Sequence, residues 1–257
     1  MMVSRLAQAA ILGAVLSAGG AGGAAAETLT DALIRAYQTS PLLDSNRAFL
    51  DIAATLAVDA PAPLQGAERI RADLTAPGDW PSADLVVASY ALAEIPEAKQ
   101  PATIAALWAS TLGVLALVEP GTPAGYARIL AARQALIEAG ASILAPCPHQ
   151  APCPLAAPDW CHFSQRLARS RDHRLAKGAE TPFEDEKFIY LLAARPGVAA
   201  EAPSARVLAP PRAGKPGIEL KLCTPQGAAE LAFAAKRDMA AYAIARRLDW
   251  GDALPEG

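Results

Sequence analysis

The sequence predicts an α/β protein with an incomplete Rossmann-type parallel sheet, a cysteine-rich loop inserted after it, and a small C-terminal β unit. Two observations predict the sheet. Short apolar runs alternate with helical segments between residues 84 and 144, as is typical of parallel strands joined by helices. The run at 84–90 is apolar at its centre, as expected for a strand that is buried on both faces.

The composition supports a folded core and excludes two classes of protein. The chain has 257 residues, of which 53% are hydrophobic, and its formal net charge is only −3. A chain of this apolar content and low net charge is not disordered as a whole. No uncharged stretch of about 20 strongly apolar residues recurs, so we expect no stable membrane insertion of the main body.

The expected elements follow one another as alternating strands and helices up to the cysteines, and as two strands and a helix after them. They are a strand over 68–75, a strand over 84–90, a helix over 101–112, a strand over 113–119, a turn over 120–123, a helix over 125–139, a short strand at 142–144, strands at 205–208 and 217–223, and a helix over 236–247.

Polar residues stand where the expected strands of the sheet end. In open parallel sheets, ligands bind beyond the carboxyl ends of the strands, so these residues are candidates for cofactor contact. They are Asp73, Ser89, Tyr90 and Glu119. For Asp73 and Glu119, capping of the next turn or helix is an equally good interpretation. The glycine-rich loop that such a cofactor needs is missing, because the dense glycines at 19–23 follow no strand.

The first 50 residues have a different character. Residues 1–26 have the pattern of a secretory signal peptide, with Arg5 before an apolar run and Ala24–Ala26 at the expected cleavage site. An alanine-rich disordered terminus is the alternative. Residues 27–50 predict a helix that Thr30 caps. Together the two segments resemble the start of outer-membrane efflux-channel proteins, a resemblance that ends at Leu50.

The four cysteines are the sharpest signal in the chain. Their spacing is C-x5-C-x7-C-x61-C, and the first three stand in a proline-rich loop; the residues are Cys147, Cys153, Cys161 and Cys223. The spacing leaves three interpretations open: two disulfides, a zinc site in which His149 or His162 replaces a thiolate, or a [4Fe–4S] cluster with four thiolates.

A basic segment follows the third cysteine. Residues 163–177 contain five cationic residues against one Asp, and we expect them on a helix. The cationic residues are Arg166, Arg169, Arg171, Arg174 and Lys177. Such a helix is either a solvated face or a surface that binds nucleic-acid phosphates.

Three motifs connect the chain to a known family: EPGT at Glu119–Thr122, the proline-flanked cysteines, and WCHF at Trp160–Phe163. From about Asp51 to the C-terminus the sequence resembles the mitochondrial ribosomal small-subunit assembly methyltransferase-like family, which includes bacterial relatives. The resemblance implies a methyltransferase-like core over 51–145, a cysteine-rich and basic segment over 146–190, and a small α+β unit over 191–257.

The resemblance also implies function. It assigns the four cysteines to a [4Fe–4S] cluster, with zinc as the alternative, and the basic segment to the rRNA of the small ribosomal subunit. It implies S-adenosylmethionine near Asp73 and the strand that ends at Tyr90. The family's first strands and glycine-rich loop would precede Asp51, where the channel-like start stands instead. We therefore hypothesise a chimera joined near Leu50, either a fusion or a gene-model error.

The sequence thus predicts a factor for assembly of the small ribosomal subunit and for translation, with a cytoplasmic main body. An active S-adenosylmethionine-dependent rRNA methyltransferase is the alternative, against which the missing glycine-rich loop argues. An exported protein with disulfides is a second alternative, which the signal-like segment favours and the expected cluster does not.

Overall fold

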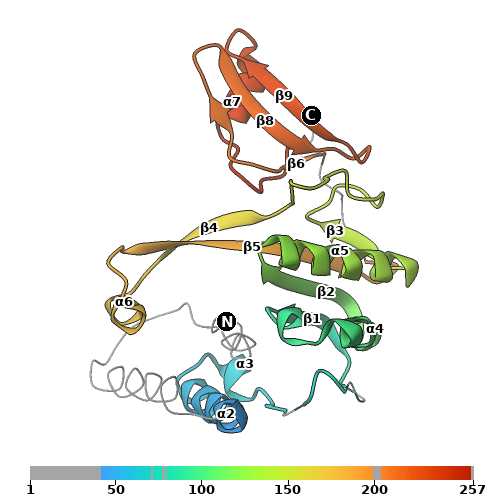
Figure 1. Ribbon diagram of the computed structural model, residues 1–257, viewed down its shortest axis with the longest axis vertical. Helices are drawn as coiled ribbons and strands as arrows, with labels where there is room; N and C mark the ends of the chain where they lie inside the picture. Colours follow the sequence, from blue (N-terminus) through green and yellow to red (C-terminus); the bar gives the residue numbers. More distant parts are fainter. Residues whose placement is uncertain (1–41, 71, 77, 79, 199–203, 256–257) are drawn as a thin grey trace. The chain divides into compact units, whose positions relative to one another are not determined.

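The computed structural model describes residues 42–70, 72–76, 78, 80–198 and 204–255 (Figure 1). The signal-like segment and most of the channel-like segment lie outside these residues. The chain divides into two compact units. One contains the residues up to Asp73 together with Arg166–Glu184, and the other contains Leu74–Gln165 and the residues from Asp185 onward.

The larger unit is built on a sheet with parallel and antiparallel strands. Its strands are β1 (Ala83–Ser89), β2 (Thr111–Pro120), β3 (Ser142–Ala145), β4 (Phe163–Ala168) and β5 (Phe183–Ala194), and they run in the order β1-β2-β5-β3, with β4 paired to β5. β1 and β2 are parallel as predicted. β5 was not predicted, and it runs antiparallel between β2 and β3. The fold is therefore α/β, and its mixed sheet is consistent with an incomplete Rossmann-like methyltransferase fold.

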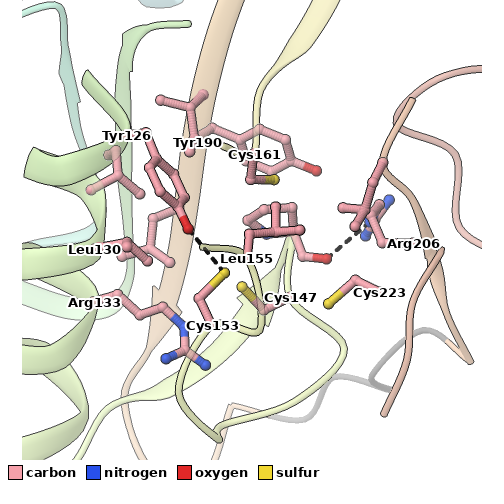
Figure 2. A pocket seen from close by; sticks show the side chains of 15 residues that line it. Tyr126, Leu130, Arg133, Cys147, Cys153, Leu155, Cys161, Tyr190, Arg206 and Cys223 are labelled. Atoms are coloured by element: carbon pink, nitrogen blue, oxygen red, sulfur yellow. Dashed lines mark hydrogen bonds between the residues drawn. The ribbon is translucent and has the colours of Figure 1, made fainter. Parts of the chain in front are cut away.

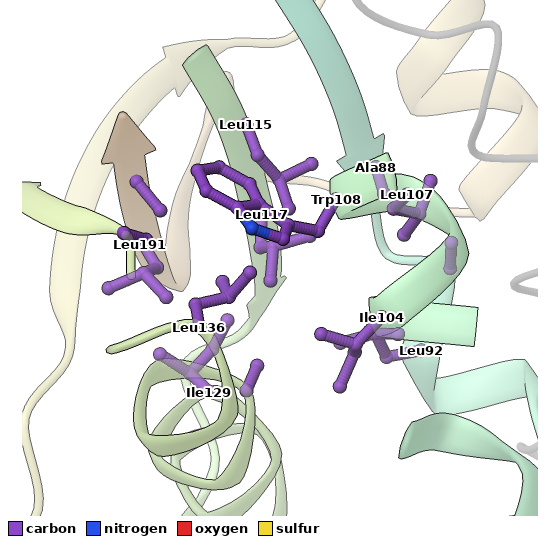
Figure 3. Packing of buried hydrophobic residues seen from close by; sticks show 14 of the residues in the cluster. Ala88, Leu92, Ile104, Leu107, Trp108, Leu115, Leu117, Ile129, Leu136 and Leu191 are labelled. Atoms are coloured by element: carbon purple, nitrogen blue, oxygen red, sulfur yellow. The ribbon is translucent and has the colours of Figure 1, made fainter. Parts of the chain in front are cut away.

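The centre of the sheet holds the main hydrophobic core. Leu115 and Leu117 of β2 and Leu191 of β5 are fully buried, and Leu117 lies opposite Leu191 in the strand register. Figure 3 shows these side chains facing α4 (Gln100–Ala109) and α5 (Pro123–Glu138). The two helices thus cover the same face of β2.

The prediction that β1 is buried on both faces is wrong. Val86 and Ala88 point to the core, whereas Leu85 and Val87 are exposed. Successive side chains of a strand point to opposite faces. Both α4 and α5 pack on the core side, so the alternate side chains of β1 stay open to solvent in the described part of the chain.

The start of α5 is fixed by local chemistry that the sequence contains. The backbone N–H of Gly125 donates to the side-chain oxygen of Thr122 at 3.1 Å, which makes Thr122 the N-cap of the helix. A Cβ atom at Gly125 would collide with the carbonyl oxygen of Pro120. The EPGT motif therefore ends β2 and begins α5 in a tight turn, which sets the direction of the helix.

The C-terminal part of this unit is a second, antiparallel sheet. It contains β6 (Arg206–Val207), β7 (Arg212–Ala213), β8 (Gly217–Cys223) and β9 (Ala229–Ala235), followed by α7 (Met239–Ala245). The predicted strand at 217–223 and the predicted C-terminal helix are confirmed, whereas β9 was not predicted. The alternate residues Ile218, Leu220 and Leu222 of β8 are buried in a separate hydrophobic cluster.

The smaller unit contains α2 (Leu42–Val58), α3 (Ala62–Gln65), α6 (Arg171–Lys177), the end of β4 and the start of β5. α2 runs without interruption through the hypothetical junction at Leu50. The strand predicted over 68–75 is wrong, because its described residues form neither a strand nor a helix. No helix in the described ranges is long and apolar enough to cross a membrane.

The prediction of one helix over the basic segment is also wrong. Residues 163–168 belong to β4, and the helix α6 has only seven residues. The side chain of Ser170 accepts from the N–H of His173 at 3.1 Å and begins α6, and Gly178 ends it with a positive φ of 60°. Arg166 and Arg174 therefore lie on different elements rather than on one helical face.

Candidate metal centre

The four cysteines line one cavity in the larger unit. Three of them come from the loop 146–162, which joins β3 to β4, and the fourth comes from the end of β8. Figure 2 shows their side chains around the same space. All four are free thiols, and Cys223 is buried. Cys161 and Cys223, which have 61 residues between them in the sequence, thus meet at one site, as the sequence predicted.

Helix α5 forms one wall of the cavity. The lining residues Tyr126, Ile129, Leu130 and Arg133 have the i, i+3, i+4, i+7 spacing that places side chains on one face of a helix. The hydroxyl of Tyr126 donates to the Sγ atom of Cys153 at 3.2 Å. The helix that packs on the main sheet therefore also contacts the cysteine loop.

Arg133 is buried and holds the cysteine loop by hydrogen bonds to its backbone. Its side chain is only 3% exposed, and its Nη2 atom donates to the carbonyl oxygens of His149 and Ala151, each at 2.8 Å. Its Nε atom is buried and has no hydrogen-bond partner. One guanidinium thus holds two loop carbonyls and retains an unused donor beside the cavity.

Arg206 of β6 connects the loop to the C-terminal sheet. Its Nε atom donates to the carbonyl oxygen of Pro146 and its Nη1 atom to that of Gly251, each at 2.9 Å. Arg206 also lines the cavity. Two guanidiniums therefore stand beside four thiols, so the site combines groups that become anionic with groups that are always cationic.

His149 contacts the cavity through Cys223. Its Nδ1 atom lies 3.0 Å from the carbonyl oxygen of Ala151, and its Nε2 atom lies 3.3 Å from the Sγ atom of Cys223. A carbonyl can only accept, so Nδ1 carries the proton. Burial and the nearby Arg133 lower the pKa of His149, which keeps the ring neutral. The Nε2 atom therefore accepts from the Cys223 thiol.

Burial keeps Cys147, Cys161 and Cys223 protonated when nothing is bound. It raises the pKa of Cys147 and Cys161, and it raises the pKa of Cys223 to about 12. The other cysteines add to the increase for Cys161 and Cys223, since several thiolates in one cavity repel one another. The site therefore needs a cationic occupant to become fully deprotonated, which is how metal ions act on coordinating thiols.

Four cysteines can bind either a zinc ion or a [4Fe–4S] cluster. Within the described ranges, no three His, Cys, Asp or Glu side chains are grouped as they would be around a bound metal ion. A tetrahedral zinc site brings all its donors to one centre. In a [4Fe–4S] cluster each thiolate binds a different iron, so its sulfurs lie around a wider space. Four thiols around a shared cavity can supply the donors of either site.

Two of the strand-end residues that were candidates for cofactor contact, Glu119 and Tyr90, are hydrogen-bonded within the protein. Glu119 is 1% exposed; its Oε1 atom accepts from the N–H of Leu92 at 3.0 Å and its Oε2 atom from Nε of Arg128 at 2.7 Å. The hydroxyl of Tyr90, the residue after Ser89 at the end of β1, donates to Glu186 at 3.0 Å. Both oxygens of Glu119 are thus used within the protein.

The remaining strand-end candidate and the basic residues belong to the smaller unit. Asp73 lies there, in a segment without helix or strand. Arg169 and Lys177 both pair with Glu184, at 3.0 and 3.2 Å. The guanidinium of Arg166 lies 4.2 Å from the ring centre of Phe183.

The other two basic residues differ in exposure. Arg171 is exposed on α6, and the Nε atom of Arg174 is buried without a hydrogen-bond partner. Three of the five cations thus contact side chains of β5 or its start, one is exposed, and one has a buried Nε atom without a partner.

Comparison with known proteins identifies the family. A profile for the mitochondrial small ribosomal subunit Rsm22 family matches residues 13–255. The chain belongs to this family. The human ribosome assembly protein METTL17, mitochondrial, is 31% identical over an alignment of 185 residues that covers 67% of this chain. The alignment covers only 39% of METTL17, so the chain corresponds to well under half of that relative's length.

The comparison confirms the resemblance to the ribosomal assembly family. The match to the Rsm22 family begins at residue 13 and so includes much of the segment that resembles a channel-protein start. Sequence reasoning found the four cysteines from their spacing. It missed Tyr126, Arg133 and Arg206, although the seven-residue spacing of the first two on a predicted helix was visible.

Proposed function

We propose that this chain acts in assembly of the small ribosomal subunit, binds its rRNA, and holds a [4Fe–4S] cluster with its four cysteines. Membership of the Rsm22 family and the similarity to METTL17, a ribosome assembly protein, support the first part. The observation that carries the cofactor is the meeting of four free thiols at one cavity. The two guanidiniums beside it would offset the net negative charge of a cationic iron–sulfide core bound by four thiolates.

The donor set favours a cluster over the other two interpretations. Disulfides would pair the cysteines, and all four are free. The C-x5-C and C-x7-C spacings are wider than the C-x2–4-C pairs that zinc sites usually have. Free thiols also suit a reducing compartment, so the proposal places the main body in the cytoplasm.

The cluster would join parts of the chain that are distant in sequence. Cys147, Cys153 and Cys161 would hold it from the loop, and Cys223 would hold it from β8. A bound cluster supplies a four-point cross-link and a centre that exchanges one electron. Arg133 and Arg206 already fix the loop carbonyls, so the four thiols are held near the site before the cofactor arrives.

Two measurements test the cofactor. Anaerobically purified protein should contain iron and sulfide in equal amounts, about four of each per chain. Cys147→Ser and Cys223→Ser should each lose most of this iron, whereas Leu155→Ala, which shortens an apolar lining residue, should keep it. Stoichiometric zinc without iron in the wild type would refute the cluster.

The rRNA contact is proposed for the basic residues of the smaller unit. Affinity for small-subunit RNA should fall steeply with salt, because bound phosphates release counterions. The variant in which Ala replaces Arg166, Arg169 and Arg174 should bind more weakly, with a log–log salt slope reduced by roughly 0.7–0.9 for every phosphate that the variant no longer binds. An unchanged slope in a folded, iron-loaded variant would remove this segment from the interface.

Methyl transfer is not part of the proposal. The family resemblance implies S-adenosylmethionine, but this chain has no glycine-rich loop. Glu119, the strand-end acid, is committed to Arg128 and to a backbone N–H. Calorimetry with S-adenosylmethionine should therefore show no binding at micromolar concentrations, and measurable binding would restore the methyltransferase alternative.

A further inference from the structure

Arg133 is a buried cation whose countercharge is not supplied by the described protein. Its side chain is 3% exposed, and no carboxylate pairs with it in the part of the chain that the structure describes. A charge buried without a partner costs several kcal/mol, so such groups are normally paired. The two loop carbonyls that Arg133 holds are neutral dipoles that accept from its Nη2 atom, and the side chain of Cys147 is a further hydrogen-bonding neighbour of the guanidinium.

The unused part of this guanidinium lies at the cavity. The Nε atom of Arg133 is buried without a hydrogen-bond partner, and Arg133 lines the same space as the four cysteines (Figure 2). An anion in the cavity would supply the missing countercharge. A four-thiolate cluster is such an anion, because its thiolate charges exceed the charge of its iron–sulfide core.

Tyr126 provides a second polar contact from the same helix. Its hydroxyl donates to the Sγ atom of Cys153 at 3.2 Å, and its ring is half-buried against the main core. Packing fixes the ring, so the hydroxyl stays directed at the sulfur. Tyr190 of β5 also lines the cavity, but its hydroxyl makes no hydrogen bond to a cysteine among the described residues.

We propose that Tyr126 and Arg133 are positioning residues that raise the reduction potential of the cluster held by the four cysteines. This inference rests on the proposed function. Adding one electron makes the cluster more negative, and both a hydrogen bond to a ligand sulfur and a nearby cation stabilise the more negative state. Helix α5 thus links the EPGT turn at its start to the electronic properties of the cofactor.

The test is a redox titration of the iron-loaded full-length protein with dithionite as the one-electron donor. Electron paramagnetic resonance of the reduced cluster reports the reduced fraction, and iron content reports retention of the cofactor. Tyr126→Phe removes only the donor, and Tyr190→Phe removes a hydroxyl from the same cavity as the matched control. Arg133→Gln removes the charge, and Arg133→Lys retains it.

Tyr126→Phe should keep its iron and show a lower potential. A net hydrogen bond of about 1–1.5 kcal/mol corresponds to a change of roughly tenfold in the ratio of reduced to oxidised cluster, or about 59 mV for one electron. Tyr190→Phe should titrate as the wild type, and Arg133→Gln should shift further in the same direction than Arg133→Lys.

The outcomes separate the inference from the function on which it rests. Wild-type protein without iron would refute the cluster and this inference with it. An iron-loaded wild type whose potential equals that of iron-loaded Tyr126→Phe would refute the inference alone. Tyr126→Phe leaves the loop carbonyls held by Arg133 in place, so it answers the question even where Arg133→Gln fails to fold.

Discussion

Replacing Arg128 with Met should destabilise the larger unit through the buried carboxylate of Glu119. The Arg128 side chain is 20% exposed, whereas that of Glu119 is 1% exposed. Met retains much of the aliphatic length of Arg but removes the charge and the 2.7 Å hydrogen bond. Glu119 then keeps backbone donors such as the N–H of Leu92 but has no countercharge.

Breaking a fully buried ion pair by removing one partner costs about 3–5 kcal/mol. Water reaches Arg128 and Glu119 retains backbone donors, so we expect a loss near the lower limit, about 3 kcal/mol. Burial already raises the pKa of Glu119, and Arg128 opposes the increase, so Arg128→Met raises this pKa further.

The pH dependence of the stability loss follows from this increase in the pKa of Glu119. The stability associated with a carboxyl whose folded pKa is raised is fully present below the unfolded pKa, about 4.3, and is lost as the pH rises through the folded pKa. The deficit of Arg128→Met should therefore be largest at neutral pH and decrease on acidification.

Urea unfolding followed by tryptophan fluorescence at pH 7.5 and pH 5.5 measures both effects, with all variants in the same metal state. The double variant Glu119→Gln/Arg128→Met has no buried charge and should lie within about 1.5 kcal/mol of the wild type, since the amide still accepts from Leu92. A loss below about 1 kcal/mol for Arg128→Met at both pH values would refute the reasoning.

Two further predictions concern the core and the basic segment. Leu191→Ala should lower the free energy of unfolding by about 2–5 kcal/mol in the same urea assay, because the side chain is fully buried at the centre of β5. Glu184→Gln should tighten binding to small-subunit RNA and steepen its salt dependence, because it releases Arg169 and Lys177 for phosphates. Unchanged binding by Glu184→Gln would show that these two cations do not contact the RNA.

Local patterns predicted the elements whose partners lie close in sequence. The apolar run 113–119 and the alternating residues of 217–223 gave β2 and β8 nearly to their ends. β5 was missed because four charged residues, Glu184–Lys187, follow its first residue, Phe183, and the strand becomes continuously apolar only from Phe188. Its antiparallel place between β2 and β3 depends on long-range pairing, which no short window of sequence contains.

In the candidate site, too, the sequence predicted the features that depend on local pattern and missed those that depend on long-range contacts. The cysteines could be found because ligand chemistry restricts the residue type, and the proline-rich loop concentrates three of them within 15 residues. Arg133 and Arg206 could not be found because an arginine on an amphipathic helix or a short strand is normally solvated. Only the folded chain shows that both guanidiniums face inward and bind backbone carbonyls of the loop.

These contacts make the cavity the junction between the two sheets of the larger unit. Arg133 belongs to a helix packed on the main sheet, Arg206 and Cys223 belong to the C-terminal sheet, and the loop between them carries three thiols. A cofactor bound to all four cysteines would therefore connect both sheets through the loop. Because metal binding to a site that forms only on folding is itself folding free energy, loss of the cofactor should weaken the docking of the C-terminal sheet more than the core around Leu117.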